Sequence, residues 1–230
     1  MEGHPDDVEL ACLGTLIKLR DEGSRITIVS VTNGGMGASH DAGLLDSIVD
    51  VRYVEASAVA ARLRGEYLTL GGRDGYLFDT PELRDALAAV IRRVRADVVF
   101  APPPVDYHYD HINAGQIAFS SVSLARSGMA IEGDPLDYMP ALFYFDAIGG
   151  IDFNPSFFVD ISAEIDEKKE LLALHPSQMS NMKNLGGWDL VEYAEIVGRY
   201  RGLQGTTRYA EAFQSCLRWP RGRAFSQFPA

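Results

Sequence analysis

The sequence predicts an α/β fold, Rossmann-like, in which a mostly parallel sheet lies between two layers of helices. Short apolar segments rich in β-branched residues alternate with helical segments of ten or more residues, which is the pattern of successive βαβ units. The chain has 230 residues, of which 47% are hydrophobic and 23% charged. This composition is that of a globular protein with a sizeable core. We therefore expect a three-layer α/β/α architecture in a single domain, residues 1–230.

The amino-terminal half alternates helices and strands. Apolar residues recur near a 3.6-residue period after Val8, which predicts an amphipathic helix. The third expected helix has clear start signals, because Thr80 is a good N-cap and Pro81 suits the first helical position. Strands are expected where short runs of β-branched or apolar residues occur. In order, we expect a helix over 8–22, a strand over 25–32, a helix over 44–64, a strand over 67–70, a helix over 81–95 and a strand over 97–101.

The carboxyl-terminal half begins with a helix and two strands and then becomes mostly helical. The turn-like stretch 149–155 lies between the two strands, which can therefore form a hairpin or simply follow one another. In order, we expect a helix over 112–126, strands over 141–145 and 157–161, and helical segments over 165–174, 188–200 and about 210–217.

The start of the chain does not follow the usual order of such folds. A doubly wound sheet normally begins with a strand that leads into the first ligand-binding loop. Here only Met1, Glu2 and Gly3 precede the first polar cluster. Either a first strand lies outside this sequence, or the sheet is built without it.

Charge and composition exclude several classes of partner. Lys and Arg total 21 against 32 Asp and Glu, a formal net charge of −11. Nucleic acids and anionic membrane surfaces require basic patches, so neither is expected as a partner. No apolar run approaches the ~20 residues that span a bilayer, and no signal peptide is recognisable. We expect a cytoplasmic protein without membrane insertion. Cys12 and Cys216 show no CxxC spacing, so neither a disulfide framework nor a thiolate metal site is indicated.

The clearest chemistry lies in two clusters of polar residues. The first, Gly-His-Pro-Asp-Asp at 3–7, joins directly to the first predicted helix, where free N–H groups favour carboxylates. His4 and Asp7 can converge, because Pro5 fixes one backbone angle between them. The second cluster, 108–111, follows the strand predicted at 97–101. It therefore lies at the sheet edge where α/β folds bind ligands.

Together the clusters supply the ligands of a catalytic zinc site. Such sites use three ligands from His, Asp or Glu and leave a fourth position for water. We expect Zn²⁺ to be bound by His4, Asp7 and His111. One carboxylate and two imidazoles leave the site net positive, so it lowers the pKa of bound water toward ~7.

The remaining residues of the clusters divide the catalytic work. Asp6, a carboxylate beside the ligands, is the candidate general base. His108 lies where it can stabilise an oxyanion or protonate the departing amine. Asp110 can hydrogen-bond one of the imidazoles and fix its tautomer.

Each cluster taken alone also has an ordinary explanation. A loop histidine such as His4 is commonly exposed, and Asp6 and Asp7 before a helix are commonly caps. Structural histidines would explain the second cluster in the same way. The shared site is favoured because both clusters fall at strand ends of one α/β pattern with complementary ligand types.

The paired motifs resemble those of the LmbE-like, or PIG-L, family of zinc-dependent N-deacetylases. The resemblance is carried by His4-Pro5-Asp6-Asp7, His108-x-Asp110-His111, Thr32–Gly37, Arg52, Glu55, His175–Gln178 and Tyr209–Phe213, and so extends over nearly the whole chain. It implies a Rossmann-like fold, a zinc site at the positions of the three expected ligands, and a general base at Asp6. It also implies that His108 assists the tetrahedral intermediate and that Arg52 contacts substrate.

Three residues are predicted to bind substrate: Arg52, Gly35 and His175. Arg52 can instead form a surface ion pair with Glu55 at i,i+3 spacing. His175 can act on a helix dipole rather than at the pocket rim. The family commonly has an acidic residue at Gly35 and often Pro at Tyr109, and these departures bear on the substrate more than on the reaction.

We therefore expect a metal-dependent hydrolase that removes an N-acyl group, N-acetyl in the first instance, from a glucosamine-type substrate, an amino sugar or glycoside. Two alternatives remain: an amidase acting on a thiol–glucosaminyl conjugate, and a non-catalytic metal-containing module that binds sugar. The sequence leaves a homo-oligomer possible.

Overall fold

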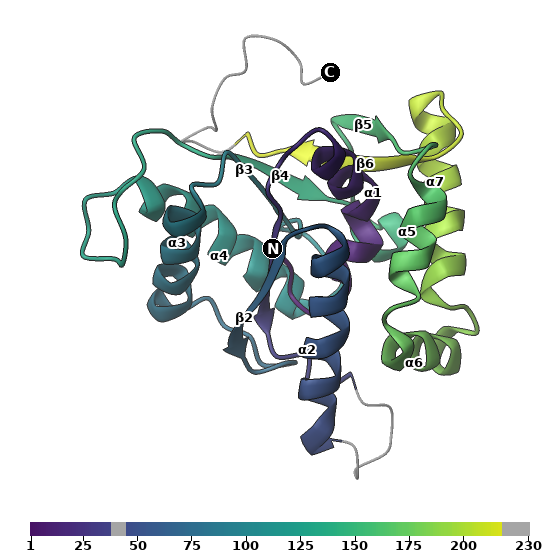
Figure 1. Ribbon diagram of the computed structural model, residues 1–230, viewed down its shortest axis with the longest axis horizontal. Coiled ribbons are helices and arrows are strands. Elements are labelled where there is room, and N and C mark those ends of the chain that lie inside the picture. The colour runs from purple at the N-terminus through teal and green to yellow at the C-terminus, as the bar shows by residue number, and fades with distance from the viewer. Residues whose placement is uncertain (38–44, 218–230) are drawn as a thin grey trace.

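The computed structural model describes residues 1–37 and 45–217, which form a layered α/β structure (Figure 1). The expected first residue of the second helix, Leu44, lies outside the described residues. In chain order the elements are α1 (Asp7–Asp21), β1 (Thr27–Thr32), α2 (Leu45–Arg62), β2 (Glu66–Gly72), α3 (Pro81–Val94), β3 (Val98–Ala101), α4 (Tyr109–Arg126), β4 (Ala141–Phe145), the short 3₁₀ helix η2 (Ile148–Gly150), β5 (Phe157–Asp160), α5 (Ile165–Leu172), α6 (Pro176–Gly186), α7 (Leu190–Gly205) and β6 (Ala210–Ser215).

The strands form two groups, in the orders β1-β2 and β3-β4-β6-β5. β1 and β2 are parallel, with Ile28 opposite Tyr67, and β3 and β4 are parallel, with Phe100 opposite Phe143. β6 is antiparallel to both β4 and β5. The predicted α/β class is confirmed, but the parallel arrangement holds only for the first four strands. β5 pairs with β6, so β4 and β5 do not form a hairpin.

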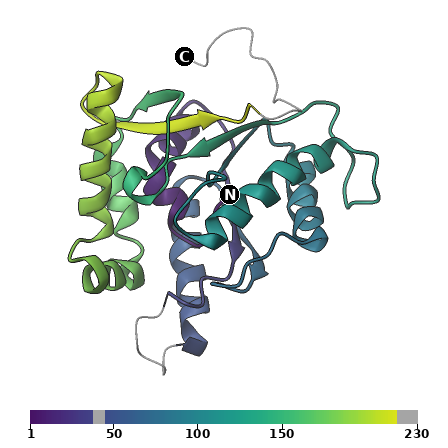
Figure 2. The same cartoon turned by 180° about the vertical axis from the view of Figure 1, so that it is seen from behind.

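Helices cover both faces of the strands, as the three-layer prediction requires. α3 and α4 pack on one face through residues such as Leu87 and Ile117, together with Val31 and Leu142 of the strands. α1, α2, α5 and α7 pack on the other face, around a cluster that includes Phe213. Figures 1 and 2 show α3 and α4 on one side and α5 and α7 on the other.

The first three residues join the two groups of strands. Glu2 forms a parallel bridge with Ser30 of β1, and the Met1 nitrogen donates to the carbonyl of Phe100 in β3 at 2.7 Å. Beyond this short segment the facing edges of β1 and β3 are separated by a cavity of about 550 Å³, which α1 and α3 also line. Among the described residues, this short segment lies where the usual order of such folds has a first strand.

Two predictions for the carboxyl-terminal third are corrected. Residues 210–217 were expected to be helical, but 210–215 form β6, the strand between β4 and β5. A short run of buried residues has no period that separates strand from helix, and its place in the sheet decides the outcome. Helix α6 was not expected at all, although Pro176 occupies its first turn.

The described helices include none with the length and apolar character needed to cross a membrane.

Candidate metal centre and catalytic site

The two polar clusters meet at the carboxyl ends of β1 and β3. The first cluster forms the turn between Gly3 and α1, and the second forms the start of α4 after β3. The bridge from Glu2 to β1 and the contact of Met1 with β3 hold these two turns side by side. Glu2 also accepts a hydrogen bond from the Val8 N–H at 2.9 Å, so the carboxylate of Glu2 caps the first turn of α1.

The three expected metal ligands converge. The Nδ1 atom of His4 lies 3.1 Å from the Nε2 atom of His111 and 3.4 Å from Oδ2 of Asp7. The third distance, from His111 Nε2 to Asp7 Oδ2, is 3.3 Å. All three side chains are buried. Ligands bonded tetrahedrally to zinc at about 2.0–2.1 Å lie about 3.3 Å apart, so the donor atoms fit this ion.

Each histidine of this set presents its second ring nitrogen to a carboxylate. The Nε2 atom of His4 lies 3.1 Å from Oδ1 of Asp74 and 3.2 Å from Oδ2 of Asp110. The Nδ1 atom of His111 lies 3.0 Å from Oδ1 of Asp106. A carboxylate on the outer nitrogen holds the proton there and leaves the inner nitrogen free to bind a cation. Asp110 therefore makes the imidazole contact that the sequence predicted.

The charges of the cluster are strongly interdependent. Burial raises the pKa of Asp7, but His111 and His4 outweigh it and hold this pKa well below its ordinary value. Burial lowers the pKa of His111, but Asp7 and Asp106 raise it to about 9. His4 follows the same pattern, since Asp7, Asp110 and Asp74 raise its pKa well above the ordinary value against burial. A cation bound here would take the place of these protons.

Asp6 lies at the N-cap position of α1, but its side chain makes no capping hydrogen bond. Its backbone adopts a left-handed conformation with φ of 113°, which is strained for a residue with a side chain. Burial raises the pKa of Asp6 and the Arg52 guanidinium lowers it, and the net value is about 6. A carboxylate with this pKa, next to a ligand, has the properties of a general base near neutral pH.

Arg52 on α2 forms hydrogen bonds with residues of the first cluster and of the loop after β1. Its guanidinium donates to Oδ1 of Asp6 at 3.1 Å and to the carbonyl of Gly34 at 3.0 Å, and it also donates to the carbonyl of Pro5. The side chain is only 3% exposed. The surface ion pair with Glu55 is therefore wrong, because Arg52 is buried and its carboxylate partner is Asp6. Direct contact of Arg52 with substrate stays a prediction.

His108 and Tyr107 form the open side of the site. The ring of His108 is half-buried, and its centroid lies 4.7 Å from that of His4 and 4.9 Å from that of His111. Burial and the two neighbouring imidazoles lower the pKa of His108. Its Nδ1 accepts from the Asp110 N–H at 3.2 Å, and Tyr107 beside it is 60% exposed. His108 also has a ring nitrogen close enough to those of His4 and His111 to be a further ligand.

The other two predicted substrate residues lie in different surroundings. Gly35 is half-buried in the loop after β1, where its N–H donates to Oδ1 of Asn33 at 3.0 Å. His175 is fully buried beside Glu9, with 3.4 Å between His175 Nε2 and Glu9 Oε1. A ring without exposed surface does not form a pocket rim in this structure. Substrate binding by Gly35 and His175 stays a prediction.

Sequence reasoning missed Asp74, Asp106 and Tyr107. Asp74 lies in the turn after β2 and reaches His4 only through the tertiary fold. Asp106 would have been easier to predict from the sequence than Asp74, since it precedes the second cluster by two residues in a strand-end loop. Tyr107 also adjoins that cluster, but the sequence alone does not predict that this residue is exposed.

Comparisons with known proteins agree in family. The model of the PIG-L family, described as GlcNAc-PI de-N-acetylase, matches residues 2–122. A diacetylchitobiose deacetylase from Thermococcus kodakarensis is 30% identical over 226 residues, which cover 93% of this chain and 80% of that protein.

Solved structures show the same fold. The conserved protein TT1542 from Thermus thermophilus has a TM-score of 0.79 at 36% identity, with 97% of each chain covered. The 4-carboxy-2-hydroxymuconate hydratase GalB from Pseudomonas putida has a TM-score of 0.78 at 22% identity, with 99% of this chain and 97% of that chain covered. The second likeness is one of fold alone.

Proposed function

The chain belongs to the PIG-L family, and on this premise we propose that it is a zinc-dependent hydrolase that removes an N-acetyl group from a glucosamine-type substrate. The observation that carries the proposal is the convergence of His4 Nδ1, Asp7 Oδ2 and His111 Nε2 to within 3.1–3.4 Å of one another. This donor set suits zinc in both chemistry and spacing.

In this proposal the residues around the ligands carry out distinct steps. Zinc held by His4, Asp7 and His111 would supply Lewis acidity, which polarises an amide carbonyl and lowers the pKa of a water molecule. Asp6 takes the proton from the attacking water and delivers it to the leaving amine. His108, on the open side of the cluster, donates a hydrogen bond to the oxyanion that develops as the carbonyl carbon becomes tetrahedral. Arg52 keeps the Asp6 carboxylate in place through the bond of 3.1 Å.

The proposed substrate class is supported by the family and by the open side of the site. The family description and the deacetylase of Thermococcus both refer to N-acetylglucosamine units. The exposed ring of Tyr107 offers a flat apolar surface on which a pyranose face can stack. We propose a soluble N-acetylated amino sugar or glycoside, with a thiol–glucosaminyl conjugate as the alternative. The cytoplasmic location stays a prediction.

The fold does not decide the reaction, since a hydratase has the same fold. The proposal therefore rests on the residues of the site. A hydrolase needs a water, a base and a cation in one place, and the cluster with Asp6 beside it provides the base and the cation site.

The proposal is tested by acetate release from a panel of acylated sugars. The panel contains N,N'-diacetylchitobiose, N-acetylglucosamine and an N-acetylglucosaminyl thioconjugate, each incubated with zinc-supplemented protein. We expect equimolar acetate and free amine from at least one member, and the pattern identifies the preferred aglycone. Sugar binding without product would support the non-catalytic module. The absence of both sugar binding and product across the whole panel would refute the substrate class.

A further inference from the structure

Helix α1 is broken in the middle. Cys12 has φ of −143° and ψ of 16°, which is outside the helical region. In an unbroken helix the N–H of Gly14 would donate to the Leu10 carbonyl, and the N–H of Thr15 to the carbonyl one residue later. The break is buried, since Leu10, Cys12, Gly14 and Thr15 are all buried. The freed backbone groups therefore need partners within the protein.

Two charged side chains from distant elements supply these partners. Glu211 of β6 accepts from the N–H of Gly14 at 2.8 Å and from the N–H of Thr15 at 2.7 Å. Lys168 of α5 donates to the Leu10 carbonyl at 2.7 Å and to Glu211 at 2.6 Å. We call these two residues the kink clamp; Lys168 is 2% exposed and Glu211 is 4% exposed. They insert an ion pair between the donor and acceptor groups that a straight helix would join.

The clamp acts on the turn that carries the candidate metal ligand. The Leu10 carbonyl lies one helical turn beyond Asp6 and three residues beyond Asp7. Within the same turn, the Val8 N–H donates to the Glu2 carboxylate and the Leu10 N–H donates to the Asp6 carbonyl at 2.9 Å. The turn from Asp6 to Leu10 is thus held at Val8 by a buried carboxylate and at Leu10 by a buried ammonium group.

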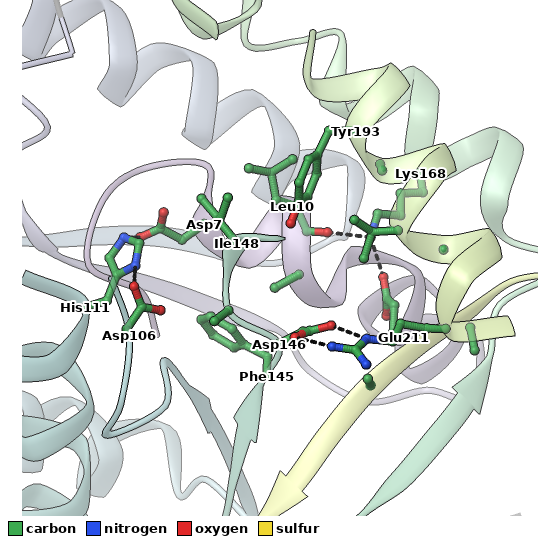
Figure 3. A pocket seen from close by; sticks show the side chains of 18 residues that line it. Asp7, Leu10, Asp106, His111, Phe145, Asp146, Ile148, Lys168, Tyr193 and Glu211 are labelled. Atoms are coloured by element: carbon green, nitrogen blue, oxygen red, sulfur yellow. Dashed lines mark hydrogen bonds and ion pairs between the residues drawn. The ribbon is translucent and has the colours of Figure 1, made fainter. Parts of the chain in front are cut away.

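The clamp and the ligands also border one pocket. Figure 3 shows Asp7 and His111 on one side of it and Lys168 and Glu211 on the other, with Leu10 and Tyr193 between them. The pocket has a volume of about 30 Å³, which is room for a water molecule or two, so the turn of α1 has little space in which to shift.

We propose that Lys168 and Glu211 are positioning residues of the active site: by holding α1 kinked at Cys12 they set where Asp6 and Asp7 lie relative to His111. The inference rests on the proposed function for its catalytic consequence. A buried ion pair gains little net stability over apolar packing because both charges lose water. The kink clamp is better explained by geometry, since a shift of about 1 Å in a catalytic group is costly for reaction.

Metal affinity tests the proposal. Lys168→Met and Glu211→Ala remove either half of the clamp, and Glu211→Gln retains one acceptor oxygen. The matched control is Arg92→Met, because Arg92 is also buried and also donates to backbone carbonyls. These are the carbonyls of Leu124, Ala125, Ser127, Ile131 and Gly133, at the end of α4 opposite His111 and in the segment that follows it. Zn²⁺ affinity is measured by competition with a chromophoric chelator, well below the melting temperature.

We expect Zn²⁺ binding to weaken by about tenfold or more in Lys168→Met and Glu211→Ala, in the range found for residues that orient metal ligands. Glu211→Gln should fall between these variants and the wild type. Arg92→Met should change the affinity less than twofold, even where it lowers the melting temperature as much. Equal effects of the clamp and control variants would overturn the proposal.

Hydrogen exchange gives a readout that does not depend on activity or metal. Exchange is compared between the wild type and the clamp variants, both without added metal. We expect faster amide exchange in the variants at Gly14 and Thr15 and also at Val8 and Leu10. Acceleration at Gly14 and Thr15 alone would show that the clamp does not reach the ligand turn and would overturn the inference. If the wild type binds no zinc and releases no acetate, the proposed function fails. The exchange result still shows whether the kink clamp holds the turn from Asp6 to Leu10.

Steady-state kinetics separate positioning from general damage. A displaced Asp6 or Asp7 should lower kcat with KM within about twofold of the wild type, because the sugar-binding surface is untouched. An effect on KM alone would contradict the proposal.

Discussion

At the scale of single residues, the site is a set of imidazoles fixed by carboxylates. His4 and His111 each direct one ring nitrogen to the shared position and the other to a buried acid. The carboxylates therefore set which ring nitrogen keeps its proton when a cation displaces the other. This arrangement is what distinguishes the cluster from two ordinary loop histidines.

We predict that Asp106→Asn weakens zinc binding by about 10- to 100-fold, because the amide no longer holds the proton on Nδ1 of His111. Competition titration measures the effect. Asp137→Asn is a suitable control, since Asp137 is exposed and its carboxylate pairs with Arg95 at 3.2 Å. An unchanged affinity in Asp106→Asn would show that the His111 tautomer is fixed in another way.

Asp6→Asn is predicted to keep zinc while losing turnover. An amide cannot accept the proton of the attacking water, so kcat should fall by about 10²- to 10⁴-fold. Metal content and kcat are measured on the same preparation. A near-normal rate would remove Asp6 from the role of general base.

The sequence was sufficient to predict the residues of the site that lie in the two motifs. His4, Asp7, His111 and Asp110 contact one another, while Asp6 adjoins Asp7 in the chain and pairs with Arg52. The metal-binding and catalytic roles of these residues stay predictions. The sequence was not sufficient for Asp74, because that contact depends on how the turn after β2 folds against the first motif. The burial of Arg52 and His175 depends in the same way on packing between elements.

At the scale of elements, α4 positions His111 by close contact with the loop after β3. A Cβ atom added at Gly115 would lie 2.6 Å from the carbonyl oxygen of Pro102. Helix and loop therefore meet at a distance that only glycine allows. The second motif lies in the first turn of this helix, so a displacement of that end of α4 would move a candidate ligand.

Gly115→Ala is accordingly predicted to cost about 1–3 kcal/mol of stability and to weaken zinc binding. Gly128→Ala is the control, because a Cβ atom there meets nothing within 4 Å. Thermal unfolding and zinc titration check the pair. If the two variants behaved alike, the close approach of α4 would not matter for the site.

Elements with their own start signals or periodicity were predictable, and those set by the sheet were not. Thr80 and Pro81 begin α3 as expected, and Thr80 accepts from the Leu83 N–H. β6 could not be assigned from its residues, since all of Ala210–Phe213 are buried on both faces. The kink in α1 could not be predicted from the sequence either, because it is bound by Glu211 and Lys168, which lie about 150–200 residues away along the chain.

At the scale of the molecule, the sheet is divided where β1 and β3 face one another. In the part of the chain that the structure describes, Met1–Gly3 lies between them, and the cavity of about 550 Å³ continues the line of this segment between α1 and α3. Such a cavity forgoes apolar contacts that a packed interior would make. The site lies at one end of this weakly joined region.

An apolar segment of about five β-branched residues added before Met1 is therefore predicted to pair with both edges and raise Tm by about 5 °C or more. A Gly/Ser segment of equal length is the control. Differential scanning calorimetry compares the two proteins. No difference in Tm would show that the cavity does not accept a strand.

Deacetylation is proposed to depend on a zinc centre formed by His4, Asp7 and His111. The most direct test is acetate release by protein dialysed against a chelator, then titrated with Zn²⁺ while bound metal is measured. We predict that activity is lost on dialysis and returns in proportion to zinc up to one ion per chain, and that His111→Ala neither binds the ion nor recovers. Amide hydrolysis that persists unchanged in the zinc-depleted protein would contradict the account.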